Sequence, residues 1–224
     1  MSDPRILVYS RTTGYRHASI PAGVEAFRRL GAEHGLDVTA TEDPDELTRG
    51  LPGSRAVVFL STSGDVLTDE GRAALRGFVA DGGGFVGVHA ASTTEYGWPW
   101  FGETLVGTVF DGHPDLQPGV VSVEDRDHPA TAHLGERWEF TDEWYNFATN
   151  PRERVRVLAA ADESTYTGGR MGADHPLVWC HERAGGRSFY TALGHSDECF
   201  SDPDFTRHLL GGLRWAACLP ADGA

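Results

Sequence analysis

The chain has 224 residues, of which 40% are hydrophobic and 23% charged, the usage of a globular protein with one sizeable core. Its formal net charge of −14 is spread along the sequence, so we expect neither the basic face of a nucleic-acid-binding protein nor binding to an anionic membrane. All 19 basic residues are arginine, and the absence of lysine excludes Schiff-base catalysis, covalently held pyridoxal phosphate and a P-loop.

The first 91 residues alternate buried-type strands with amphipathic helices. A helix is predicted from an N-cap at Ser19 to Gly35, and a second from an N-cap at Thr68 to the glycines that follow Asp81. Strands that alternate with helices predict right-handed βαβ units and a doubly wound parallel sheet. The predicted strands are 5–10, 37–41, 56–62 and 84–91.

The second half is mostly strand-like, with turn signals between the segments. AGGR at 184–187 predicts a hairpin, and a last helix is expected over 204–217. No linker or repeat divides the chain, so we expect a single domain over 1–224 with additional strands in its second half. The predicted strands are 120–125, 137–147, 154–160, 176–182 and 187–195.

The three cysteines, Cys180, Cys199 and Cys218, are odd in number and show no CxxC spacing, so neither a disulfide framework nor a thiolate zinc site is expected. The N-terminus lacks the charged and long apolar regions of a signal peptide, and no segment has the length of a membrane span. We therefore expect a cytoplasmic protein without a membrane partner. Whether it forms a homo-oligomer is left open.

Polar residues follow several predicted strands, at the sheet edge where α/β proteins bind ligands. The predicted strand 84–91 ends in Gly87-Val88-His89-Ala90-Ala91, which resembles the nucleophile elbow of class I glutamine amidotransferases with His89 in place of the cysteine. His195 stands where the partner histidine of that family would lie. Because imidazole cannot replace a thiolate in glutamine hydrolysis, the amidotransferase architecture is expected without its reaction.

A longer set of motifs resembles the ThuA-like (trehalose utilisation) family over about residues 5–217. The resemblance implies a flavodoxin-like, amidotransferase-type fold and a role in bacterial sugar utilisation, sometimes beside sugar dehydrogenases. The motifs are GYRHASI, FLSTSGDVL, GGGFVGVHAAS, EYGWPW, GHP, DRDHP, TDEWYNF, HPLVWCHE and FYTALGH.

Two histidines are the first candidates for catalysis. His89 and His195 end predicted strands, and imidazole moves protons near neutral pH, although both could be core histidines. Of the adjacent acids in the predicted strand 137–147, only one should face the site, and alternation favours Glu143 over Asp142. His128 and His175 precede prolines and are interpreted as solvated loop residues; the histidines left as structural or surface groups are His34, His133, His181 and His208.

Substrate-binding candidates surround these histidines in the sequence. Aromatic rings pack on the C–H faces of sugars, and charged groups bind sugar hydroxyls, although core or lid packing would also explain many of the aromatics. His17 could instead brace its loop, and His113 could serve only the rigid turn before Pro114. The candidates are Tyr15, Arg16, His17, Trp98, Trp100, His113 and Tyr145.

Three functions fit this sequence. The first is an enzyme acting on a sugar or keto-sugar by acid–base chemistry of His89, His195 and Glu143, in an isomerisation, hydration or hydrolysis. The second is a zinc-assisted hydrolase or lyase. The third is a non-catalytic sugar-binding module. No GxGxxG fingerprint follows the first strand, so a bound nicotinamide is not expected. The candidate zinc ligands are His17, His89, His113, His195 and Glu143.

Overall fold

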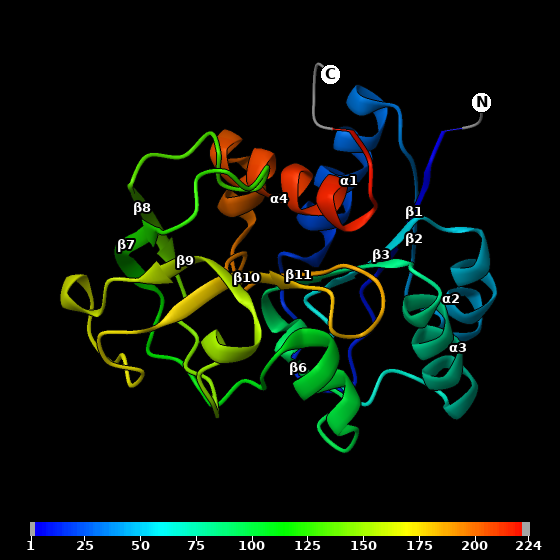
Figure 1. Ribbon diagram of the computed structural model, residues 1–224, viewed down its shortest axis with the longest axis horizontal. Coiled ribbons are helices and arrows are strands. Elements are labelled where there is room, and N and C mark those ends of the chain that lie inside the picture. Colours follow the sequence, from blue (N-terminus) through cyan, green and yellow to red (C-terminus); the bar gives the residue numbers. More distant parts are fainter. Residues whose placement is uncertain (1–2, 221–224) are drawn as a thin grey trace.

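One nine-stranded mixed sheet organises the computed structural model, which describes residues 3–220 (Figure 1). The strand order is β2-β1-β3-β5-β11-β10-β9-β7-β8, and the first five strands are mutually parallel. β3 and β5 are apolar and fully buried, as strands covered on both faces should be. The bounds of the parallel strands are β2 Asp37–Thr41, β1 Arg5–Tyr9, β3 Ala56–Leu60, β5 Gly84–Val88 and β11 Ser188–Thr191.

The other four strands are antiparallel and come from the second half of the chain. β10 and β11 form the hairpin predicted at 184–187, and β8 alternates exposed with buried residues. The doubly wound fold with additional antiparallel strands is therefore confirmed. The bounds are β10 Pro176–His181, β9 Arg156–Ala161, β7 Gln117–Val123 and β8 Arg137–Asp142, with a separate short parallel pair of β4 Ser63–Gly64 and β6 Thr93–Thr94.

Helices cover both faces of the parallel half (Figure 1). α1 (Ile20–His34) and α4 (Pro203–Ala216) lie on one face, and α2 (Pro44–Gly50) and α3 (Asp69–Ala80) on the other. Thr68 caps α3 as predicted, by accepting a hydrogen bond from Gly71 N. The short α2 was not expected; its cap is Asp43, which accepts from the first turn of the helix.

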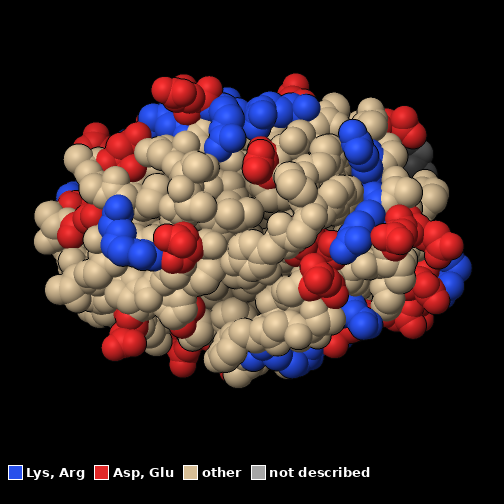
Figure 2. All heavy atoms as spheres, turned by 90° about the horizontal axis from the view of Figure 1, so that it is seen from below, with Lys and Arg blue, Asp and Glu red and all other residues tan. Residues whose placement is uncertain are grey.

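The surface carries charges of both signs. Figure 2 shows arginine and acidic side chains interspersed along the rim of one face, whose middle is formed mainly by uncharged residues. Among residues 3–220, none of the helices combines the length and the apolarity that a membrane span requires.

The expectation that His128 and His175 are solvated is wrong: their exposed fractions are 1% and 0%, and His208 is also fully buried. His128 stacks on Phe189, and His208 Nδ1 lies 2.9 Å from the carbonyl oxygen of Ala130. A following proline fixes the local backbone but does not keep the side chain exposed. α4 packs over the loop of His128, and His175 lies between the Tyr145 carbonyl and the Tyr166 hydroxyl. Burial lowers the pKa of His128 to about 4 and that of His208 to about 3.

These buried imidazoles predict acid lability. Their folded pKa values lie below that of an unfolded histidine (about 6.5), so the unfolded chain binds protons first as the pH falls. The stabilisation present above about pH 6.5 should decrease toward pH 4, by on the order of 3 kcal/mol for each histidine. Urea denaturation across this range measures the loss. His208→Leu should flatten the profile, and a profile parallel to that of the wild type would contradict the assignment.

A pair of helical glycines predicts opposite effects of one substitution. A Cβ at Gly211 in α4 would lie 2.3 Å from the carbonyl oxygen of Pro129, whereas one at Gly77 in α3 would meet no atom of the described residues within 4 Å. Gly211→Ala should destabilise the fold by about 1–3 kcal/mol. Gly77→Ala should stabilise it by about 0.5–1 kcal/mol, because alanine loses less backbone entropy in a helix. Equal melting shifts for the two variants would refute the close packing of α4.

Candidate functional site

The turn after β5 is as sharp as the elbow motif predicts. His89 has a positive φ of 50°, which is costly for a residue with a Cβ, and it opens a 3₁₀ turn at His89–Ser92. Tyr190 secures the turn by donating its hydroxyl to the His89 carbonyl at 2.8 Å. The imidazole is fully buried, and its Nδ1 donates to the carbonyl of Ala192 at 2.7 Å. Its Nε2 is therefore the ring nitrogen without a proton in the neutral form.

His17 reaches the same point from the loop after β1. Its side chain is buried, its Nε2 lies 3.2 Å from His89 Nε2, and its Nδ1 has no hydrogen-bond partner among the described residues. Ser19 occupies the predicted N-cap position of α1, but its side chain makes no capping hydrogen bond. Its hydroxyl donates instead to the carbonyl of His195 at 2.6 Å, which joins the start of α1 to the loop after β11.

Glu143 and His195 complete the cluster. The strand expected over 137–147 ends at Asp142, so Glu143 lies in the turn that follows and not within the strand. Its Oε2 lies 3.0 Å from His195 Nδ1 and 3.6 Å from His89 Nε2. The carboxylate is not aligned with the His195 ring for a hydrogen bond, despite the short distance. Four side chains that are distant in sequence thus converge, and we call His17, His89, Glu143 and His195 the four-residue cluster.

Asp142 supports the cluster from behind, a role that sequence reasoning missed. The carboxylate is fully buried and accepts the backbone N–H groups of Glu143, Gly194 and His195 at 2.8, 2.7 and 3.2 Å. Burial raises its pKa, against these hydrogen bonds and the nearby His89. Of the two adjacent acids, Glu143 faces the histidines, and Asp142 fixes the two loops that carry Glu143 and His195.

Charges within the cluster are strongly coupled. Burial, followed by the neighbouring imidazoles of His89 and His195, lowers the pKa of His17 to about 3. Burial alone would raise the pKa of Glu143, but His195 and His89 outweigh it and lower that pKa. Glu143 in turn raises the pKa of His195, against burial. The cluster therefore contains an ionised carboxylate and a neutral His17 imidazole at pH 7.

The ligand atoms of the cluster fit a metal ion. One atom from each residue lies within 4.8 Å of all the others. Bonds of 2.0–2.2 Å in a tetrahedral zinc site place neighbouring ligand atoms about 3.3 Å apart, close to the separations given above. The hydrogen bond from His89 Nδ1 to a backbone carbonyl also orients a ligating histidine in the usual way. His113 lies outside this set, with its Nε2 3.5 Å from Glu143 Oε2.

A pocket of about 520 Å³ opens onto the cluster. Tyr145 forms part of its wall, with its hydroxyl 2.9 Å from His89 Nε2 and its carbonyl oxygen 2.8 Å from Nε2 of the buried His175. His113 stacks on Tyr145, and Tyr15 lines the pocket at the surface. Five of the predicted positions, Tyr15, His17, His113, Glu143 and Tyr145, therefore line one cavity, and His89 and His195 lie behind its wall in contact with Glu143.

Three predicted substrate-binding residues do not line this pocket. Arg16 points to the surface, where its guanidinium donates to both carboxylate oxygens of Glu42 at 3.0 and 2.7 Å. Trp98 and Trp100 pack on each other with ring centroids 4.8 Å apart, beside Phe101 of the core. Packing against the core accounts for both tryptophans. Tyr96 in the same loop lines the pocket instead, and no sequence signal distinguished it from them.

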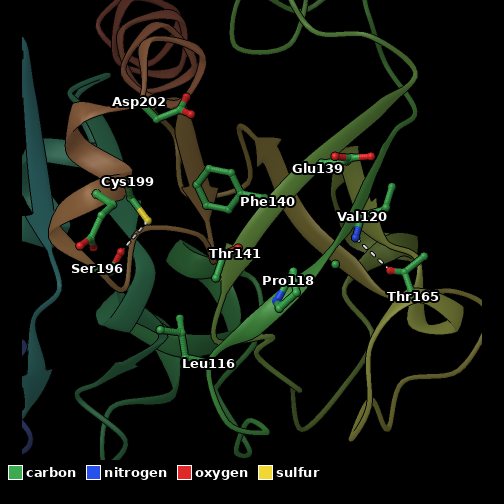
Figure 3. A pocket seen from close by; sticks show the side chains of 12 residues that line it. Leu116, Pro118, Val120, Glu139, Phe140, Thr141, Thr165, Ser196, Cys199 and Asp202 are labelled. Carbon is green, nitrogen blue, oxygen red and sulfur yellow. Dashed lines mark hydrogen bonds between the residues drawn. The ribbon is translucent and has the colours of Figure 1, made fainter.

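A second cavity of about 770 Å³ lies on the other side of Asp142, between β7, β8 and a 3₁₀ turn at Asp197–Ser201 (Figure 3). Its walls include Leu116, Phe140, Ser196 and Cys199. The Ser196 hydroxyl and the Cys199 thiol lie 3.6 Å apart. Burial raises the pKa of the Cys199 thiol to about 12, so the thiol is inert at neutral pH. None of the described histidines lines this cavity, which gives it no acid–base chemistry comparable to that of the first.

Comparisons with known proteins agree with this architecture. A family model described as trehalose utilisation (ThuA) matches residues 5–216. A ThuA-like protein from Bacteroides uniformis superposes with a TM-score of 0.81 at 27% identity, covering 96% of this chain and 93% of its own. A ThuA-like protein from Parabacteroides merdae superposes with a TM-score of 0.79 at 21% identity, covering 96% of this chain and 90% of its own. A search of the curated proteins gives no match.

A more distant structure shares the fold alone. A β-galactosidase from Bacillus circulans sp. alkalophilus superposes with a TM-score of 0.61 at 14% identity, over 98% of this chain and 32% of its own. The fold thus also occurs as about a third of a longer chain.

The role of Asp142 predicts the effect of an almost isosteric change. Asp142→Asn replaces one acceptor oxygen by an NH₂ group that faces backbone N–H donors, so the fold should lose about 1–3 kcal/mol. The amides of Gly194 and His195 should exchange faster with solvent. Glu139→Gln, at an exposed position of the same strand, should change stability by less than about 0.5 kcal/mol. An unchanged rate of amide hydrogen exchange at Gly194 in the Asp142→Asn variant would show that Asp142 does not hold this loop.

Proposed function

Because the chain belongs to the ThuA (trehalose utilisation) family, we propose that it is a metal-dependent enzyme of carbohydrate utilisation. The four-residue cluster would hold one divalent ion, and three imidazoles with one carboxylate suit zinc best. The pocket beside the cluster would take a sugar or keto-sugar derivative.

The convergence of the cluster is the observation that carries this proposal. Its residues come from four loops that follow β1, β5, β8 and β11, and the backbone strain at His89 is maintained to place one imidazole there. His89 Nε2 lies 3.6 Å from Glu143 Oε2 and 3.2 Å from His17 Nε2. Electron-rich atoms gathered this closely are stabilised by a proton or a cation that they share. Groups that share an ion would face one another in this manner.

The residues around the cluster supply further chemistry. A divalent ion bound there would polarise a sugar hydroxyl or carbonyl oxygen and favour its deprotonation or attack. Tyr145 offers a hydroxyl 2.9 Å from His89 Nε2, at the wall of the pocket. His113 Nδ1 lies 2.8 Å from the carbonyl oxygen of Pro114, and its Nε2 faces Glu143 Oε2 at 3.5 Å, beside the space that a substrate would occupy. Hydrolysis, hydration and isomerisation of a sugar derivative are all compatible with these groups.

A second candidate is acid–base catalysis by His195, Glu143 and His89 without an ion. The 3.0 Å separation of Glu143 and His195 favours it, because the carboxylate would stabilise an imidazolium. The two candidates differ in whether the protein requires metal.

Metal analysis of the purified protein tests the proposal. After chelation and reloading, elemental analysis should find about one zinc ion per chain, and zinc should raise the melting temperature. Glu143→Gln and His195→Ala should each weaken zinc binding by at least about 100-fold, since even the loss of a group that orients a ligand costs 10–100-fold. His133→Ala is the control, because His133 lies away from the cluster with its Nε2 2.9 Å from the carbonyl oxygen of Asp204.

Activity assays then separate the alternatives. Turnover of sugar substrates that is lost on chelation and restored by zinc supports the metal-dependent enzyme. Turnover that persists without metal, yet is lost in Glu143→Gln, would favour the metal-free candidate. Sugar binding without turnover under either condition would instead indicate a binding module.

A further inference from the structure

We propose that Tyr15 and Tyr96 form an outer subsite that holds the second ring of a neutral glycoside, while its first ring lies at the four-residue cluster. This inference rests on the proposed function and adds to it the class of substrate: a sugar with at least two rings, without phosphate.

The two tyrosines are exposed to an extent that is unusual for this chain. Within residues 3–220 only three large hydrophobic side chains are exposed, namely Tyr15 at 70%, Tyr96 at 53% and Leu116 at 47%. Both tyrosines line the pocket that opens onto the cluster. Exposed aromatic rings that gather at the mouth of one pocket indicate a surface that a ligand covers, and the C–H faces of a sugar pack well on such rings.

Both rings are held in place although they are exposed. The Tyr96 hydroxyl donates to the carbonyl of Phe110 at 3.2 Å. The Tyr15 ring contacts the ring of His17 edge to face, with centroids 4.8 Å apart. The backbone carbonyl of Tyr15 accepts a hydrogen bond from the Ser63 hydroxyl. Rings fixed before binding lose little entropy when a ligand arrives. The arrangement is therefore suited to a binding platform.

The segments that carry the tyrosines are joined to each other through β4. Thr13 N donates to the Ser63 carbonyl at 2.9 Å, and Glu95 N donates to the Gly64 carbonyl at 3.1 Å. Gly64 has a φ of +77°, and a Cβ there would lie 2.4 Å from Thr13 Oγ1. Only glycine permits this close approach. The two loops therefore form one connected rim around the pocket.

The burial of the lining residues shows that the tyrosines lie outward of the reacting groups. Among the lining residues, His17 is 5% exposed and the Glu143 side chain 13%, whereas the tyrosines are more than half exposed at the mouth of the pocket. A single ring bound at the cluster would leave the outer platform empty. A ligand with a second ring would cover both.

The charges around the pocket exclude a phosphorylated outer ring. Within residues 3–220 no arginine lines the pocket, and the chain contains no lysine. Arg16, next to Tyr15, is occupied by both oxygens of Glu42, and Arg72 donates to the buried Glu95. Phosphate recognition in proteins relies on such cations or on helix N-termini, and no residue in the first turn of α1, the helix that follows His17, lines the pocket. The outer ring that fits here is therefore a neutral sugar.

Titration calorimetry on the zinc-loaded protein tests the subsite, with glucose as the one-ring probe and trehalose, maltose and cellobiose as two-ring probes. The wild type should bind at least one disaccharide about 10-fold more tightly than glucose. Tyr15→Ala and Tyr96→Ala should each weaken the binding of that disaccharide by about 3- to 10-fold and should change the affinity for glucose by less than about 2-fold. Trehalose 6-phosphate should bind no more tightly than trehalose.

Two control variants separate the ring from other effects. Tyr15→Phe keeps the ring and should retain the affinity for the disaccharide. Leu116→Ala removes the third exposed side chain, which lines the other cavity, and should change neither affinity. Zinc content is measured for every variant, so that loss of the ion is not mistaken for loss of the subsite.

Each result has a definite meaning. If glucose and the disaccharides bind equally, or if the alanine variants weaken both to the same extent, the outer subsite is refuted while the proposed function stands. Tighter binding of trehalose 6-phosphate than of trehalose would overturn the assignment of a neutral sugar to the outer subsite. If the zinc-loaded wild type binds no sugar, the carbohydrate part of the proposed function falls together with the subsite.

Discussion

The buried carboxylate of Asp142 joins the two halves of the sheet at the point where the site lies. It ends β8, an edge strand of the antiparallel half, and accepts the N–H groups of Gly194 and His195 just beyond β11 of the parallel half. An ionisable group without solvent contact is stable only when such donors satisfy it. Asp142 therefore positions Glu143 and His195, and the loop after β11 that it holds also bonds His89 through Ala192 and the start of α1 through Ser19.

His89 is positioned in a different way, by a turn with a strained backbone that neighbouring residues stabilise. Its left-handed backbone costs on the order of 1–3 kcal/mol, which the Tyr190 hydroxyl and the buried 3₁₀ turn offset. Ser19 contributes in a similar way, because its hydroxyl leaves the helix uncapped in order to bind the His195 carbonyl. The backbone conformation of His89 and the missing side-chain cap at Ser19 each lower local stability next to the cluster. Both positions are explained by the geometry of the site and not by the packing of the core.

The fold also occurs within a β-galactosidase, at an identity too low to carry function across. A scaffold of this kind determines where side chains gather, namely at the carboxyl ends of its parallel strands, and the chemistry depends on which residues are placed there. In this chain an imidazole occupies the elbow, two further imidazoles and a carboxylate face it, and tyrosines line the mouth of the pocket. The same edge of the sheet thereby presents a cluster of imidazoles and a carboxylate instead of the cysteine of an amidotransferase elbow.

The sequence by itself determined the alternation of strands and helices, the sharp turn at His89 and the place of His195 after a late strand, although that strand ends at Thr191 and not at His195. These features depend on local patterns of burial, turns and spacing. The sequence did not determine that His17 faces His89, that Asp142 lies beneath both loops, or that Tyr96 and not Trp98 lines the pocket. Nor did it show that His128 and His175 are buried. Those facts depend on which loops the sheet order brings together and on what packs over them, and residues 17, 89, 143 and 195 meet only because β1, β5, β8 and β11 direct their ends to one place.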